Sequence, residues 1–313
     1  MFNSAFFRRP SNDQNPPVQE NKIIFRQLEI KDIEPLIEAG FAHSKSRLKQ
    51  SLPDRFFQRI RFKPFSTGLV AYHIQEKQAI GFLQLNRYSK WLYSLKFAFT
   101  NPSFRRKGVG SGLFNFAFSQ VRNKGGRKIF LNVDPNLTSS IDLYGKLGFE
   151  LISKSYEVWC HIEVSKFLRR HEKYLNPINL DSKKNKSDLF DICKHCMNSE
   201  WIDFFETKYD TLTNGFSGDF RRMYFKNAFV NNDKNSFALV FRRPFSHNPL
   251  VELFVSTDSE IPYMLNGLIR VFQDQKINGV SLKLFNIKTD SCVQKIKKTS
   301  FYVYHSLCMG KSL

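Results

Sequence analysis

The chain has 313 residues, a length that suggests about two domains of ordinary size. Hydrophobic residues make up 42% of it and charged residues 24%, which excludes a disordered, collagen-like or disulfide-scaffold chain. The formal net charge of +20 favours anionic partners, such as phosphorylated cofactors or acidic proteins.

The same counts bear on compartment and partners. Five cysteines without regular spacing fit a reducing environment, and no apolar run reaches the roughly 18 residues of a membrane span. The first 20 residues lack the long apolar region of a secretory signal. We expect a cytoplasmic protein with no membrane partner. Because the basic residues are dispersed, nucleic acid is not the expected partner, and an acidic protein is one candidate.

Strand and helix patterns alternate over the first 165 residues, after a polar tail expected at residues 1–20. The expected strands are 23–28, 68–75, 79–88, 91–100, 128–133 and 149–158. The expected helices are 30–42, 44–60, one that ends near residue 123, and 137–147. This order predicts an α/β or α+β sheet domain over residues 21–165.

The segment with the clearest chemical signal is a Gly-rich loop between a strand and a helix. Residues 97–113 read FAFTNPSFRRKGVGSGL, so Arg105, Arg106 and Lys107 stand beside Gly108 and Gly110. Unpaired amides at a helix N-terminus attract anions, and glycine lets a phosphate approach the backbone. The loop follows neither the GxGxxG nor the Walker pattern. It predicts a diphosphate site, and the alternative is a turn that only caps the helix.

Two blocks together resemble a known family. Residues 101–110, Asn-Pro-Ser-Phe-Arg-Arg-Lys-Gly-Val-Gly, resemble motif A of the GNAT superfamily of acyl-CoA-dependent N-acyltransferases. Residues 143–149, Leu-Tyr-Gly-Lys-Leu-Gly-Phe, resemble a second block of that family, in the expected order. The resemblance covers about residues 23–165. It implies a mixed central sheet with flanking helices, and acetyl-CoA as the acyl donor.

The resemblance also implies roles for individual residues. It implies that the donor is held by the loop residues Arg105, Arg106, Lys107, Gly108, Val109, Gly110 and Ser111. The strand end at Phe99 and Thr100 would pair with the pantetheine arm and polarise the thioester by oxyanion-type stabilisation. Tyr144 would protonate the departing thiolate, against the alternative of a packed core tyrosine.

Two positions depart from the family pattern. The family's usual asparagine falls on Leu137 here, so Asn136 keeps its contact only if a shift of one residue is tolerated. The strand at 91–100 carries no carboxylate, which leaves the general base unassigned. We expect direct attack by an amine of unknown identity, because many members need no dedicated base.

The second half repeats the element order without the loop. Residues 166–188 are polar and are expected to link domains at 21–165 and 189–313. Helix patterns at 262–275 and 289–298, with strands at 280–285 and 301–309, follow the order of the first half. Aligning Phe301 with Phe149 places 257–262 on the Gly-rich loop. That stretch has two carboxylates and no glycine, so we expect a degenerate GNAT-like repeat, the alternative being an unrelated α/β domain.

Other functions stay open from the sequence. An acyl carrier protein, which is acidic, could replace acetyl-CoA as donor on a protein of this charge. A non-catalytic module that binds CoA or nucleic acid is the alternative outside enzymes. No metal is expected, because Cys193 and Cys196 supply half of a tetrahedral site without a second pair.

Overall fold

The computed structural model describes residues 23–40, 66–161, 175–178, 182–205, 224–242, 249–274, 277, 279–285 and 300–313. The tail expected at 1–20 and the helices expected at 44–60 and 289–298 lie outside these residues. Among the described helices, none is long and apolar enough to cross a lipid bilayer.

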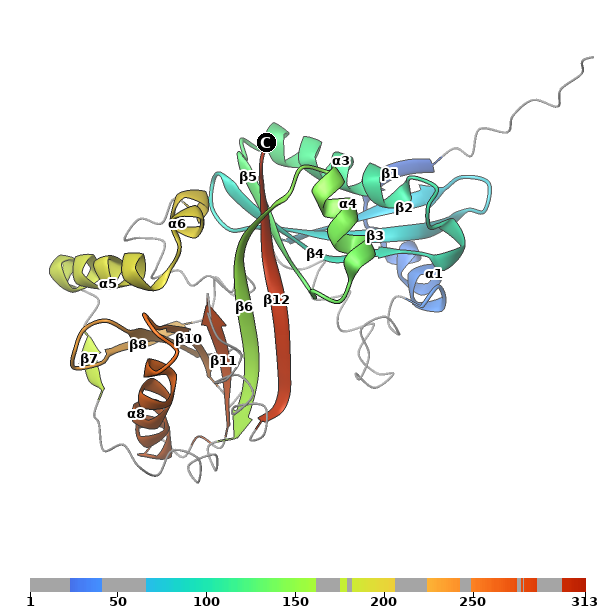
Figure 1. Cartoon of the computed structure of the whole chain (residues 1–313). Coiled ribbons are helices and arrows are strands. Elements are labelled where there is room, and N and C mark those ends of the chain that lie inside the picture. The colour runs from blue at the N-terminus through green and yellow to red at the C-terminus, as the bar shows by residue number, and fades with distance from the viewer. Residues whose placement is uncertain are drawn as a thin grey trace, which may run out of the picture.

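The described strands form one sheet of 12 strands that runs through both halves of the chain (Figure 1). Its order is β1-β2-β3-β4-β5-β12-β6-β11-β10-β9-β8-β7. The strands of the first half are β1 (Ile23–Gln27), β2 (Ser66–His73), β3 (Gln78–Arg87), β4 (Leu92–Thr100), β5 (Lys128–Val133) and β6 (Glu150–His161). Those of the second half are β7 (Asn176–Ile178), β8 (Tyr224–Val230), β9 (Phe237–Arg242), β10 (Leu250–Phe254), β11 (Gly279–Phe285) and β12 (Ser300–Ser312).

Helices cover both faces of this sheet. In the first half, α1 (Ile33–Glu38) lies on one face, and α3 (Val109–Asn123) and α4 (Thr138–Lys146) lie on the other (Figure 1). The second half contains α5 (Lys183–Cys196), α6 (Ser199–Phe205) and α8 (Glu260–Asp274). The described elements predicted from the sequence are confirmed to within three residues at their ends, except that the helix expected at 30–42 ends at Glu38.

The two halves have the same topology. In each, a run of antiparallel strands leads to a parallel pair, β4 with β5 and β10 with β11, connected through α3 or α8. Aligning Phe301 with Phe149 also places Phe285 on Val133, and these two residues are the last of β11 and β5, so the predicted alignment holds. The repeat is therefore a property of the fold, although the halves share no motif.

The last strand of each half is exchanged. β12, from the C-terminus, pairs with β5 of the first half through residues 307–312, and β6 pairs with β11 of the second half. β6 and β12 also pair with each other and run side by side between the halves (Figure 1). The linker expected at 166–188 contains β7 and the start of α5, so the chain does not divide there into two closed sheets.

Four groups of buried residues hold the layers together. The α3 core joins α3 to β2–β5 and includes Leu83, Leu95, Leu131 and Met309. The α1 core is formed by Leu36, Val70, Ala79, Phe82 and Phe99. The α8 core packs α8 on β10 and β11. The junction core spans both halves, because Leu92, Phe130 and Ile152 meet Trp201, Phe205 and Phe254 in it.

Candidate active site

A cavity of about 570 Å³ lies between the end of β4, the start of α3 and one side of α4. Its wall is formed by Phe82, Leu83, Ala98, Phe99, Thr100, Phe104, Arg105, Arg106, Gly108, Val109, Gly110, Ser111, Leu113, Phe114, Leu137, Ser139, Ser140, Leu143 and Tyr144. Most of these side chains are apolar, and the charged ones come from the loop before α3. This volume falls in the range of small-molecule sites.

The cavity exists because β4 parts from β5. The two strands pair only from Leu92 to Leu95, while β4 continues to Thr100. Its pairing with β3 is interrupted between Phe82 and Gln84, and Phe97 there has a φ of 53°. A bulge of this kind bends a strand and re-aims its residues. Phe99 and Thr100 still pair with β3, opposite Phe82 and Gly81, but they lie beyond the pairing with β5 and line the cavity.

The loop between β4 and α3 is shaped for an anion. Arg106 has a φ of 60° and Gly108, which caps α3, has a φ of 79°. Left-handed residues set among residues of other conformation can turn successive amides into a concave anion-binding arrangement. The first turn of α3 contains no acidic side chain, so its partial positive charge is not neutralised there.

Gly110 stands where α3 faces α4. A Cβ atom built on it would lie 3.5 Å from Leu143 Cδ2 and 3.8 Å from Thr100 Oγ1, both in the cavity wall. These are ordinary contact distances, so alanine fits, but a longer side chain would extend into the cavity. The missing side chain keeps the α3 amides accessible to a ligand.

Tyr144 contributes a phenol to the same wall. The ring is half-buried and packs against Phe114 and Phe149, with centroids at 5.3 and 6.0 Å. Burial raises the pKa of Tyr144, and a hydrogen bond with Ser140 partly opposes that shift. The phenol therefore stays protonated at neutral pH and can act as a proton donor.

The structure brings together most of the residues singled out in the sequence, though not all of them. Tyr144, Phe99, Thr100, Arg105, Arg106, Gly108, Val109, Gly110 and Ser111 all line the cavity. Lys107 lies outside its wall, with Nζ over the Phe104 ring at 5.1 Å. Asn136 is also outside, and both its backbone amide and Nδ2 donate to Asp134 Oδ1 at 2.9 Å.

Sequence reasoning missed the contribution of α4 apart from Tyr144. Leu137, Ser139, Ser140 and Leu143 line the cavity as well. Tyr144 and Ser140 lie four residues apart, which puts them on one side of a helix. That spacing is visible in the sequence, but nothing in it showed which side would face the cavity.

The equivalent place in the second half is closed to an anion. Eight residues connect β4 to α3, whereas five connect β10 to α8. Glu260 is the first residue of α8, and its carboxylate accepts a hydrogen bond from Asn231 Nδ2 at 3.0 Å. A carboxylate at the helix start repels a second anion. The expectation of a degenerate loop at 257–262 is consistent with this geometry.

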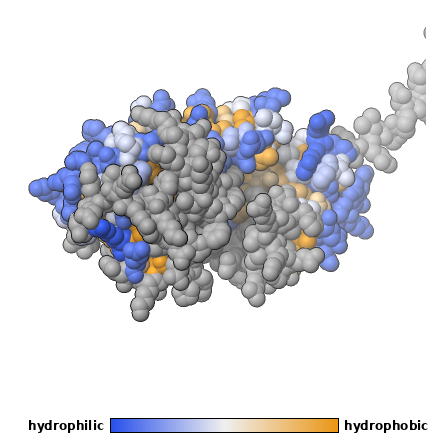
Figure 2. Space-filling view, turned by 60° about the horizontal axis from the view of Figure 1, so that its bottom comes forward, coloured by the Kyte–Doolittle hydropathy of each residue, from blue (hydrophilic) through white to orange (hydrophobic). Residues whose placement is uncertain are grey.

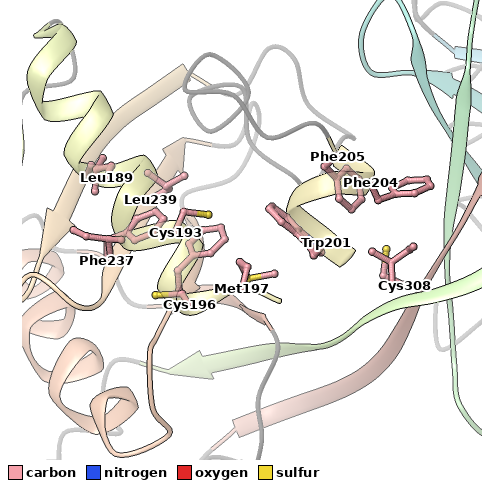
Figure 3. Packing of buried hydrophobic residues seen from close by; sticks show 14 of the residues in the cluster. Leu189, Cys193, Cys196, Met197, Trp201, Phe204, Phe205, Phe237, Leu239 and Cys308 are labelled. Carbon is pink, nitrogen blue, oxygen red and sulfur yellow. The ribbon is translucent and has the colours of Figure 1, made fainter. Parts of the chain in front are cut away.

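Three of the cysteines are packed side chains. Cys193 and Cys196 on α5 and Cys308 on β12 are buried in the junction core with Trp201 and Phe204 (Figure 3). Burial raises the pKa of Cys196 and of Cys308 to about 12. Within the described part of the chain, no group of three or more His, Cys, Asp and Glu side chains could hold a metal ion.

The family comparison agrees with this geometry. The model of the acetyltransferase (GNAT) family matches residues 31–149, which contain the cavity, the loop and Tyr144. The N-terminal region is a GNAT acetyltransferase domain. The match ends before the second half of the chain, and no curated protein sequence matches this chain.

One solved structure extends the likeness in fold over both halves of the chain. A GCN5-related N-acetyltransferase from Sphaerobacter thermophilus is 10% identical, covers 93% of this chain and 95% of its own, and has a TM-score of 0.55. That likeness shows a shared fold across both halves. An acetyltransferase from Streptococcus agalactiae is 21% identical over 42% of this chain and 84% of its own, with a TM-score of 0.37.

Proposed function

We propose that the GNAT domain transfers an acetyl group from acetyl-CoA to an amine. The observation that supports this most directly is that one cavity wall contains both the Gly108-capped start of α3 and the protonated phenol of Tyr144. The first suits a diphosphate, and the second suits a departing thiolate. The part of β4 beyond Leu95 does not pair with β5, which would leave its backbone free to pair with an extended arm.

The loop residues would hold the diphosphate of the donor. The amides of Gly108, Val109, Gly110 and Ser111 would donate to its oxygens, and Arg105 and Arg106 would add positive charge. Arg105 Nε already donates to the Thr100 carbonyl at 3.3 Å, which ties the loop to the strand end. Lys107 would act from outside the wall through its charge alone. Asn136 would contact the donor only if its hydrogen bonds to Asp134 broke.

Backbone amides near Phe99 and Thr100 would stabilise the negative charge that develops on the thioester oxygen. The acceptor attacks the thioester carbon as a neutral amine and the carbon–sulfur bond breaks. Tyr144 gives its phenolic proton to the departing thiolate and regains a proton from water. No Asp, Glu or His side chain lies among the described residues of the cavity wall. The proton of the amine would therefore leave to water rather than to a dedicated base.

A thiol-release assay tests this proposal. Purified protein with acetyl-CoA and a mixture of primary amines should release CoA thiol, and the release should stop when the amines are omitted. Absence of release together with absence of acetyl-CoA binding would refute the proposal. Binding without release would support a non-catalytic CoA-binding module instead. A cytoplasmic location and an acidic protein partner stay predictions of the sequence.

A further inference from the structure

A row of polar side chains crosses β2, β3 and β4, next to strand residues that line the cavity. It consists of the half-buried Ser66 and the buried Gln84, Asn86 and Ser94. The strand register places Asn86 opposite both Ser66 and Ser94. Gln84, Asn86 and Ser94 are 3%, 6% and 1% exposed, respectively. Burying polar groups costs free energy unless they are hydrogen-bonded, so such a row needs an explanation.

The row is not satisfied within itself. Gln84 Nε2 donates to Ser66 Oγ at 2.7 Å and to Asn86 Oδ1 at 3.0 Å. Three buried atoms then have no hydrogen-bond partner in the structure: Gln84 Oε1, Asn86 Nδ2 and Ser94 Oγ. These three atoms could still form hydrogen bonds: the oxygen can accept, the amide nitrogen can donate, and the hydroxyl can do either.

The row lies on the sheet face opposite α3. Leu83 and Leu85 belong to the α3 core, so the alternating residues Gln84 and Asn86 face the other side with Phe82. Phe82 and Phe99 belong to the α1 core and also line the cavity, which therefore reaches side chains of both faces. Gln84 follows Phe82 on that face at about 7 Å, the spacing of alternate strand residues.

We propose that Gln84, Asn86 and Ser94 bind the acceptor, and that the acceptor carries an amide group next to the amine that is acetylated. This inference rests on the proposed function. The row lies behind Phe82 and Phe99 and is not part of the cavity wall, so the acceptor would reach it by displacing these two side chains. A single amide group can donate its N–H to Gln84 Oε1 and accept from Asn86 Nδ2 or Ser94.

Other acceptor groups match the row less well. A carboxylate has no hydrogen to give to Gln84 Oε1. A second ammonium group cannot accept a hydrogen bond from Asn86 Nδ2. It would also lie near the positive charge of Lys96, the residue opposite Gln84 on β4. The row would therefore favour acceptors with a neutral amide next to the amine over acceptors with a charged group there.

Four small amines that share one carbon skeleton test this selection: L-alaninamide, L-alanine, L-alaninol and isopropylamine. With acetyl-CoA saturating, we expect kcat/KM for L-alaninamide to exceed that for isopropylamine at least tenfold, about the effect of one hydrogen bond that leaves a buried partner unpaired when lost. Equal values for the two would overturn the inference, as would a preference for L-alanine or L-alaninol. Failure to acetylate L-alaninamide while acetyl-CoA binds would overturn it too.

Variants separate recognition from folding. Asn86→Leu and Ser94→Ala should each reduce the preference for L-alaninamide at least fivefold, without changing the affinity for acetyl-CoA. Ser281→Ala is the matched control, because Ser281 is equally buried, has an unpartnered hydroxyl and lies on β11 of the second half. If the row variants only raise the melting temperature and keep the preference, the row is structural and the inference is wrong. If the unmodified protein does not bind acetyl-CoA, the proposed function itself is refuted.

Discussion

At the scale of single residues, ligand access to the α3 amides depends on the absence of a side chain at Gly110. Gly110→Asp would place a carboxylate beside the α3 amides, where it would crowd and repel a diphosphate. We expect no detectable acetyl-CoA binding by this variant in a thermal-shift assay. Gly110→Ala is the matched control, because its Cβ meets only ordinary contacts, and it should still bind. Binding by the aspartate variant would show that the loop does not hold the diphosphate.

Tyr144 contributes at the same scale, through its hydroxyl alone. Tyr144→Phe keeps the ring between Phe114 and Phe149, so the fold should be unaffected. We expect kcat to fall by about 10²–10⁴, the usual contribution of a positioned acid, while acetyl-CoA affinity stays within about twofold. Steady-state kinetics measure both quantities. An unchanged kcat would mean that Tyr144 is only a packed core residue.

Individual residues were predictable from the sequence where local backbone geometry dictated them. Gly108 takes a left-handed conformation at a helix start, and that requirement is visible as a glycine beside basic residues. The side chain of Asn136 could not be placed, because its hydrogen bonds to Asp134 form only in the folded turn. The row of Gln84, Asn86 and Ser94 could not be predicted either. These residues lie on two strands, and only the pairing of β3 with β4 in the folded sheet places them side by side.

At the scale of elements, packing in the junction core raises the pKa values of the thiols of Cys193, Cys196 and Cys308. Their pKa values are raised by burial, to about 12 for Cys196 and Cys308, against about 8.5 for an exposed thiol. The folded state therefore keeps protons that the unfolded state loses as the pH rises above about 8.5. The stabilising effect of these thiols is complete below that pH and is lost progressively as the pH rises toward 12.

This predicts unreactive thiols in the folded protein. In a variant with Cys160→Ser and Cys292→Ser, the remaining Cys193, Cys196 and Cys308 should not react with Ellman's reagent at pH 8. All three should react after unfolding in guanidinium chloride. Rapid reaction of any of them in the native state would contradict the packing of α5 and β12 shown in Figure 3.

At the scale of the whole molecule, the exchange of β6 and β12 joins the two halves into one folding unit. Lys128 Nζ of β5 donates to the carbonyls of Asp203 and Phe204 at 3.0 Å, at the end of α6. Met309 of β12 is buried in the α3 core of the GNAT domain. On the face in Figure 2, the described residues at the two ends are mainly hydrophilic, and hydrophobic residues are visible in several small separate areas.

The GNAT domain should therefore depend on the C-terminus of the chain. Met309→Ala should lower the free energy of unfolding by about 2–5 kcal/mol, as for other buried methionines, measured by urea denaturation. Ser312→Ala, at an exposed position of the same strand, should change it by less than about 0.5 kcal/mol. A chain that ends at Thr299 should lose acetyl-CoA binding. Normal binding by that chain would show that β12 is dispensable for the site.

The repeat was predictable at this scale, but the exchange was not. Element order and the spacing between Phe285 and Phe301 indicated a second copy, because local patterns mark each strand and helix. Which strand completes which sheet depends on pairing between residues about 150 positions apart, such as Leu307 with Lys154. Nothing in the hydrophobic pattern of either strand distinguishes the two pairings.

The central claim is that one helix start in this tandem binds the donor diphosphate while its counterpart, closed by Glu260, does not. Isothermal titration calorimetry of the whole chain with acetyl-CoA tests it most directly. We predict one binding site per chain, absent in Gly110→Asp and unchanged in Glu260→Gln. Two sites per chain, or one site that survives Gly110→Asp, would contradict the claim.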